Sequence, residues 1–289
     1  NDLLKSLLYL HAQPPLFNFF LGIVLKLSPQ PAVSYDIFFK TAGALIPLLF
    51  YGTLTSVYMN RLLAFLITVV FMFNPTLILY ENLLYYTYIE AFFVLLAIFF
   101  LARWCARRKL IQLALFWLSL LCLGMIRSLF HPVFFVVTAV ILALYLRYSY
   151  KGEPVAKTFM VSSMIVIIPV LLLFFKNAVL FGCWGTSSWD GMNLWTKVNG
   201  FSPEQLEVFH SQGLISTLAL KADLKAFQQI TVYFDDATLK NMPCHHPADC
   251  EMTKSTGYPN FNYTGYVFLS RQLWKDAMRI IAYRPSLFV

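Results

Sequence analysis

A small set of ionisable side chains interrupts the apolar first two thirds of the chain and could carry chemistry. Glu81, Glu90, Arg127 and His131 stand beside or inside long hydrophobic runs. Charges near a membrane are costly, so such residues are candidates for function. A carboxylate can serve as a general base or bind a cation, and a guanidinium can bind two phosphate oxygens at once. Together these residue types predict acid–base chemistry beside a phosphate-bearing ligand.

The alternative for each residue is simple anchoring to lipid headgroups. Glu90 is followed by Ala-Phe-Phe-Val-Leu-Leu-Ala-Ile, which places it at membrane depth and favours a functional role. Arg127 stands at the mouth of an apolar run, where phosphate binding and headgroup anchoring are nearly equal alternatives. Asp36 begins another run, and anchoring is the favoured interpretation there.

The composition indicates which elements must position these residues. The chain has 289 residues, of which 59% are hydrophobic and 12% charged, with a mean hydropathy of +0.65. An ordinary soluble domain is about 45–50% apolar and about 25% charged. A soluble chain of this length could not bury so much apolar surface, whereas lipid can cover it. We therefore predict an all-α integral membrane protein.

Membrane spans need roughly 20 apolar residues, and about 17 can suffice. Two of the candidate segments are short and would borrow flanking residues. The six predicted spans are Asp36–Tyr58, Leu62–Tyr80, Tyr88–Ala102, Leu110–Ile126, Pro132–Leu146 and Thr158–Phe175.

The basic residues predict the orientation of these spans. Arg61 follows the first span, Arg103–Lys109 contains four bases after the third, and Arg147, Lys151 and Lys157 follow the fifth. Loops rich in Lys and Arg collect on the cytoplasmic side. The net charge of +8 is therefore interpreted as a topology signal and not as a nucleic-acid site. Both termini are expected outside.

The regions that flank the bundle differ from it in composition. Residues 1–35 are predicted to be an external loop with an interfacial helix at Leu16–Leu27, and a buried re-entrant segment is the alternative. Residues 36–176 form the transmembrane bundle. Residues 177–289 contain most of the acids and predict a small, mainly helical extracytoplasmic region. Short amphipathic helices are expected there from Pro203 and over Leu218–Ile230.

The cysteines add one predicted cross-link. Cys244 and Cys250 flank His245 and His246 in a short loop, and non-cytoplasmic cysteines this close usually pair. A zinc site is the weaker alternative, because the spacing matches no standard finger. Cys183 either pairs elsewhere or stays free. Asn262-Tyr-Thr264 is an N-glycosylation sequence, which matters if the source is eukaryotic.

Several motifs are missing from the sequence. It contains no Walker loop, no dinucleotide-binding glycine fingerprint, and no HExxH or GxSxG motif, which argues against an ATP-driven pump and against the common hydrolases. Acidic residues are few within the spans, which weighs against a proton-relay transporter.

The succession of motifs resembles one family. His11-Ala-Gln-Pro-Pro-Leu-Phe-Asn18, heading an interfacial helix, is similar to the juxtamembrane helix of membrane-embedded GT-C glycosyltransferases. The bacterial branch related to protein O-mannosyltransferases and to the lipid A aminoarabinose transferase looks most similar. The other matching segments are Asn74-Pro75, Glu90-Ala-Phe-Phe93, Arg103–Lys109, Gly124–Pro132, Lys176–Gly182 and Thr186–Leu194.

The resemblance implies a function and a set of roles. Members of the family move a sugar from a polyprenyl-phosphate donor to a lipid, glycan or protein acceptor on the outer face, and they differ in needing a divalent metal ion. It implies catalytic roles for Glu90 and Glu81, with Glu90 orienting the acceptor or binding a metal ion. It also implies donor-phosphate binding by Arg127 and His131, and a cavity lined by His11 and Tyr85.

The chain departs from the family pattern at its start. The family's catalytic acid lies in the first external loop, after a first span that this sequence lacks, and Asp2 stands too close to the Pro-Pro helix to replace it. We therefore expect a fragment that is inactive alone. The expected location is the bacterial inner (plasma) membrane, or the endoplasmic reticulum in a eukaryote.

Two other functions stay open at this point. A multi-span transporter or flippase for a lipid-linked or anionic solute would share the outward site. It should also have a matching inward-facing cavity, and inverted repeats would favour it, but none is visible. A membrane scaffold whose outer region binds a partner is the third possibility.

Overall fold

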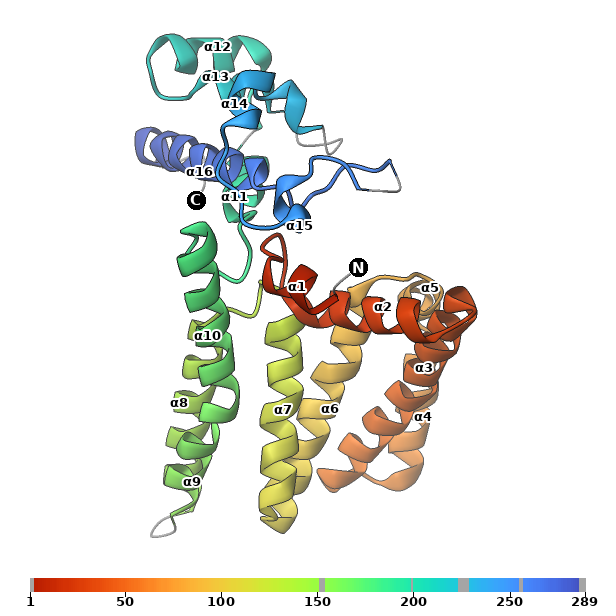
Figure 1. Cartoon of the computed structure of the whole chain (residues 1–289). Coiled ribbons are helices and arrows are strands. Elements are labelled where there is room, and N and C mark those ends of the chain that lie inside the picture. Colours follow the sequence, from red (N-terminus) through yellow and green to blue (C-terminus); the bar gives the residue numbers. More distant parts are fainter. Residues whose placement is uncertain (1–2, 151–153, 199, 223–228, 255–256, 286–289) are drawn as a thin grey trace. The chain divides into compact units, whose positions relative to one another are not determined.

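The fold is described from a computed structural model, shown in Figure 1. It describes residues 3–150, 154–198, 200–222, 229–254 and 257–285. About 75% of the chain is helical, and over these ranges the extended structure is limited to an isolated bridge between Thr253 and Pro259. The all-α prediction is therefore confirmed.

The chain forms two compact units. The central unit is Pro14–Leu173, and the terminal unit combines Asn1–Gln13 with Phe174–Val289. The sequence had suggested boundaries at residues 36 and 177 instead. It did not predict that the first 13 residues pack with the C-terminal third.

Four helical segments are long and apolar enough to cross a membrane. They are α3 (Pro31–Ser56), α6 (Tyr86–Arg107), α8 (Pro132–Ser149) and Val155–Phe181, which consists of α9 (Val155–Ser162) and α10 (Met164–Phe181). Each overlaps a predicted span. Many apolar side chains of these helices point outward, among them Leu48 and Leu144, as expected for surfaces that face lipid.

The predicted span over Leu62–Tyr80 is not one straight helix. It is divided into α4 (Arg61–Met72) and α5 (Pro75–Glu81), which are bent by 61° at the break. The cause is local: the side chain of Asn74 accepts a hydrogen bond from the Thr76 N–H at 2.9 Å, and Pro75 occupies the first helical position. Both features begin a new helix.

The remaining predicted span, α7 (Leu110–Ile126), has 17 residues and is one of two shorter apolar helices. The part of the chain that the structure describes therefore contains four candidate spans, or five if the bent pair counts as one. The other short helix is α2 (Pro15–Leu27), which coincides with the predicted interfacial helix and begins at the Pro14-Pro15 pair.

The central unit has an apolar core that α2, α3, α6 and α7 build together. Phe17 of α2 packs with Phe39 and Ile46 of α3, Tyr88 of α6 and Ile126 at the end of α7. This core lies near the start of α6, so it holds the segment that contains Glu90 in a defined position.

The terminal unit has its own core, as a water-soluble domain would. Its centre is α16 (Gly265–Tyr283), which packs on α11 (Asp190–Val198) around Trp195, Leu269 and Leu273. Gly191 permits this contact, because a Cβ atom there would lie 1.8 Å from the Ser270 carbonyl oxygen. The other helices are α1 (Leu3–Leu8), α12 (Pro203–Ser211), α13 (Thr217–Lys221), η2 (Ile230–Val232), α14 (Asp236–Lys240) and α15 (Pro247–Cys250).

The helices predicted for this region are present in part. The helix expected from Pro203 is α12, which Ser202 begins with a capping box. Over Leu218–Ile230 the structure has the short helix α13 and the first residue of η2, while residues 223–228 lie outside the described ranges.

Candidate functional site

The main candidate site is an ion pair between α6 and the end of α7. Arg127 Nη1 donates to Glu90 Oε2 at 3.0 Å. The Glu90 side chain is 10% exposed and that of Arg127 is 40% exposed. Arg127 follows the last residue of α7 in an extended conformation, so its side chain can reach the first turns of α6. The structure therefore joins two of the four ionisable residues that the sequence had marked as candidates.

One carboxylate oxygen of Glu90 is left without a partner. Oε1 is buried and accepts no hydrogen bond from any residue that the structure describes. A buried polar atom in this state costs about 1–3 kcal/mol, so proteins rarely leave one without a use. Oε1 is the atom best prepared to accept a hydrogen bond from a bound hydroxyl or amine.

The guanidinium of Arg127 lies over the ring of Tyr86, which Tyr85 and Phe17 contact in turn. Its Cζ atom lies 5.6 Å from the ring centroid of Tyr86, within range of a cation–π contact. Tyr86 precedes Glu90 by four residues on α6, so both project from one face of that helix. The hydroxyl of Tyr85 donates to the hydroxyl of Tyr86 at 2.8 Å, and Phe17 packs edge-on against Tyr86.

The pair can bind an anion as well as a hydroxyl. A guanidinium carries five N–H donors, and in the described part of the chain Glu90 accepts from one of them. The others can reach a phosphate oxygen, because the side chain of Arg127 is partly exposed. Carboxylate acceptor and guanidinium donors thus meet in one place.

Glu81 lies against a different surface. A Cβ atom on Gly43 would stand 2.8 Å from both the Glu81 carboxyl carbon and the Tyr88 hydroxyl, so these groups pack on α3. Tyr88 and Glu90 are two residues apart on α6 and therefore project about 200° apart. Among the described residues no hydrogen bond or salt bridge joins Glu81 to Glu90 or Arg127.

His131 has a structural task in the fold. It is exposed at the start of α8, where its Nδ1 accepts from the Val133 N–H at 3.3 Å and caps the helix. Asp36 forms an exposed salt bridge with Lys40 at 2.7 Å, in keeping with the anchoring interpretation. Asp2 lies outside the described residues.

His11 belongs to the terminal unit, where it is fully buried. Its Nε2 lies 2.8 Å from the carbonyl oxygen of Asn262 and its Nδ1 lies 2.7 Å from Ser188 Oγ. Because a carbonyl can only accept, Nε2 carries the proton and Nδ1 accepts from the Ser188 hydroxyl. Burial lowers the pKa of His11 to about 4, so the ring is neutral near pH 7.

Cys244 and Cys250 form a disulfide with Cα atoms 5.2 Å apart, and Cys105, Cys122 and Cys183 are free. The bonded sulfurs cannot act as zinc thiolates. Inside the loop, the buried carboxylate of Asp249 accepts from the backbone N–H groups of His245 and His246. No group of three or more His, Cys, Asp or Glu that could hold a metal ion occurs in the described ranges.

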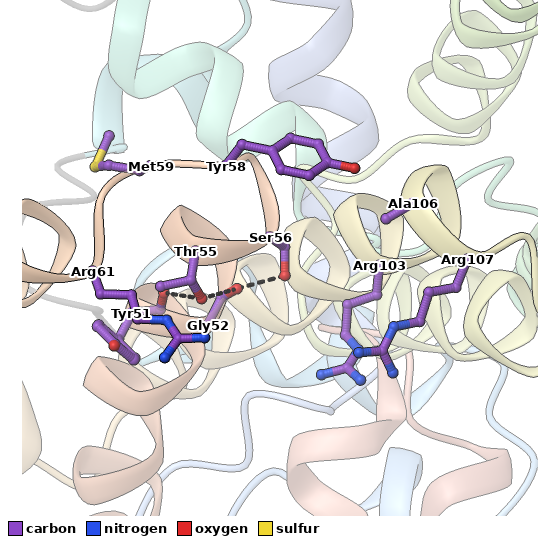
Figure 2. Close-up of a pocket in the computed structure, with 10 residues that line it drawn as sticks. All are labelled: Tyr51, Gly52, Thr55, Ser56, Tyr58, Met59, Arg61, Arg103, Ala106 and Arg107. Atoms are coloured by element: carbon purple, nitrogen blue, oxygen red, sulfur yellow. Dashed lines mark hydrogen bonds between the residues drawn. The ribbon is translucent and has the colours of Figure 1, made fainter.

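A cavity of about 530 Å³ lies at the opposite end of the central unit from the Glu90 end of α6, where α3 and α6 finish (Figure 2). It is lined by Tyr51, Gly52, Thr55, Ser56, Tyr58, Met59, Arg61, Arg103, Ala106 and Arg107. The cavity was not predicted, because these arginines were interpreted as signals of span orientation and of a family resemblance. The four-residue spacing of Arg103 and Arg107, which places both on one face of a helix, was the signal that could have identified the cavity.

Comparisons with other proteins add no information about the role of these residues. No known protein family, no curated protein and no solved structure matches the chain.

Proposed function

We propose that the chain is part of a membrane glycosyltransferase of the GT-C type, which moves a sugar from a polyprenyl-phosphate donor to an acceptor. The observation that carries this proposal is the Glu90–Arg127 pair with its unpartnered buried Oε1. The motifs between His11 and Leu194 that resemble the family support it, and the apolar helices are those of a membrane protein.

Arg127 would bind the donor phosphate, because its free N–H groups can take two phosphate oxygens. The acceptor hydroxyl or amine attacks the anomeric carbon, the bond from that carbon to the phosphate oxygen breaks, and the polyprenyl phosphate leaves with the bonding electrons. Arg127 then stabilises the charge that develops on the leaving group. Tyr86 keeps the guanidinium in position, and Tyr85 bonds to the Tyr86 hydroxyl.

Glu90 orients the acceptor through Oε1. The resemblance places the general base that removes the acceptor proton in an external loop before the Pro-Pro helix, so Glu90 is not needed for that step. Among the described residues no group of three or more His, Cys, Asp or Glu could hold a metal ion, so Glu90 would have to bind a divalent ion together with the donor phosphate. No step is therefore assigned to a metal.

The proposal includes a topology. The basic loops favour an arrangement in which Arg61, at the start of α4, and Arg107, at the end of α6, lie in the cytoplasm, which puts Glu90 on the outer side. The bent pair α4–α5 and the short helix α7 would complete six spans. A bacterial plasma membrane is the proposed location.

The test uses the full-length parent protein in native-like membranes with labelled polyprenyl-phosphate sugars. Glu90→Gln and Arg127→Ala should each lower sugar release at least about a hundredfold. The matched control is Asp36→Asn, which removes an exposed charge near the same end of the bundle and should keep the wild-type rate. Wild-type rates in both site variants would refute the assignment.

A transporter or flippase is the second candidate, and the basic cavity at the ends of α3 and α6 favours it. Such a protein needs an inward-facing site that matches the outward one. It would move an anionic or lipid-linked solute across proteoliposome membranes without releasing sugar. Label that stays on the lipid but changes leaflet would select this function.

A further inference from the structure

The cavity at the ends of α3 and α6, named here the basic cavity, gathers positive charge without a counter-charge. Arg61, Arg103 and Arg107 line it, and its lining includes no Asp or Glu. Within the described ranges none of these arginines forms a salt bridge. The contrast with Arg127, which has Glu90 beside it, suggests that a bound anion balances this charge.

Helix electrostatics accounts for only part of this arrangement. Arg107 is in the last turn of α6, where a cation stabilises the negative end of the helix dipole. Arg61, however, is the first residue of α4, where the dipole disfavours a cation. The ends of α3 and α6 each contribute about half a negative charge, and the start of α4 contributes about half a positive charge. Most of the positive charge of the three arginines is therefore left for a bound anion.

The other lining groups leave the arginines as the main donors. Thr55 Oγ1 donates to the Tyr51 carbonyl at 3.0 Å, and Ser56 Oγ donates to the Gly52 carbonyl at 2.6 Å (Figure 2). With their protons used by α3, these hydroxyls can only accept from the cavity side. An anion would therefore contact the guanidinium groups, which are also the best-shaped donors for phosphate.

Tyr58 at the cavity has an unfavourable backbone conformation. Its φ is +64°, and its side chain is 91% exposed. The turn is a Schellman motif, in which Met59 N–H donates to the Leu54 carbonyl and Tyr58 N–H donates to the Thr55 carbonyl. Glycine normally occupies the position of Tyr58, because a side chain there costs about 1 kcal/mol. Such costs concentrate at ligand sites.

We propose that the basic cavity binds a phosphate ester, carried either by the headgroup of an anionic membrane lipid or by a soluble metabolite. Its volume of about 530 Å³ lies within the roughly 300–1,000 Å³ of small-ligand sites. The three guanidinium groups hold the phosphate, and the exposed ring of Tyr58 covers it. This site is separate from Glu90 and does not depend on the proposed transferase activity.

The test is a binding titration of the detergent-solubilised chain by native mass spectrometry. The probes are short-chain phosphatidylglycerol, phosphatidylcholine of the same chain length, and glycerol 3-phosphate. The triple variant Arg61→Gln/Arg103→Gln/Arg107→Gln should bind the preferred probe at least a hundredfold more weakly. Arg147→Gln is the matched control, because Arg147 is exposed in the last turn of α8, outside the cavity.

Two further variants keep the test decisive. If the triple Gln variant does not fold, the triple Lys variant retains the charge, loses the planar fork and should bind about tenfold more weakly. Tyr58→Gly should weaken binding while the thermal stability stays the same or rises.

The outcomes separate the two sources of phosphate. Binding of phosphatidylglycerol alone identifies a lipid site, whereas binding of glycerol 3-phosphate as well identifies a site for soluble phosphate esters. Equal binding of phosphatidylcholine would overturn the proposal, because it would mean that the acyl chains and not the anionic headgroup drive binding. An equal loss in Arg147→Gln would also overturn it, because it would mean unspecific attraction to the basic end of the bundle.

Discussion

Asp276 of the terminal unit and Glu90 of the central unit are both buried carboxylates, but their surroundings differ. Asp276 accepts hydrogen bonds from the backbone and side chain of Ser216 and from Gln272, with Arg279 at 3.8 Å. Among the described residues Glu90 has one donor, Arg127, and its Oε1 has no partner. A buried charge whose oxygens are all occupied holds a fold together. One with an unoccupied oxygen is prepared for a ligand.

The largest loss of stability is expected when Asp276, whose two carboxylate oxygens both accept hydrogen bonds, is replaced. Asp276→Ala should destabilise the terminal unit by about 4 kcal/mol, because it leaves several buried donors unpaired. Hydrogen exchange at amides of α13 and α16 should become about a thousandfold faster. Asp36→Ala, which breaks an exposed salt bridge, is the control and should change exchange little. Similar effects of both substitutions would mean that the hydrogen bonds of Asp276 do not stabilise the terminal unit.

A second test uses pH on the buried histidine of the terminal unit. The folded pKa of His11, about 4, lies below the usual 6.5, so the unfolded chain binds more protons between these values. Stability is therefore full above pH 6.5 and falls by about 3 kcal/mol as the pH approaches 4. Thermal unfolding of the terminal unit across this range measures the loss. The slope should vanish in His11→Gln and persist in the exposed control His210→Gln.

The disulfide should contribute less than these buried groups. Cys244 and Cys250 are six residues apart, and closing so short a loop stabilises the folded state by about 2 kcal/mol. Replacing both by Ser should lower the unfolding free energy of the terminal unit by that amount. Cys183→Ser, at a free cysteine of the same unit, is the control. An equal loss in the control would mean that packing, and not the cross-link, is responsible.

The smallest losses of stability are expected at the Glu90–Arg127 pair, where one Glu90 oxygen accepts a hydrogen bond. Arg127→Ala should cost about 1.5 kcal/mol, because Glu90 then loses its donor while Arg127 was already partly exposed. Glu90→Gln preserves an acceptor for Arg127 and should change stability by less than about 0.5 kcal/mol. Thermal unfolding of both variants measures this. A Glu90→Gln variant as unstable as Asp276→Ala would show that Glu90 is structural.

Much of the central unit could be predicted from local sequence. The Pro14-Pro15 pair begins α2, and the apolar run that follows Glu90 lies within α6. The break before Pro75 could also have been predicted, because Asn-Pro is a helix-start signal. The apolar run around it favoured one straight span instead. The prediction gave more weight to hydropathy than to helix capping. In the structure, the capping signal at Asn74-Pro75 determines where the helix breaks.

The pairing of distant residues could not be predicted in the same way. Glu90 and Arg127 are 37 residues apart, and their contact depends on how α6 packs on α7. The roles of Tyr86 and Tyr88 depend on the same packing. The sequence also separated His11 from the C-terminal region, because no local pattern shows that Ser188 and Asn262 are its partners.

The contacts of His11 have a consequence for biosynthesis. Its backbone N–H and its ring bond to Asn262, 251 residues later in the chain. At about 5–20 residues per second, the ribosome needs roughly 13–50 s to deliver that partner. The segment around His11 must therefore wait, with its buried polar groups unsatisfied, until Asn262 has been translated. Premature termination before Asn262 would leave this segment open to chaperones and proteases.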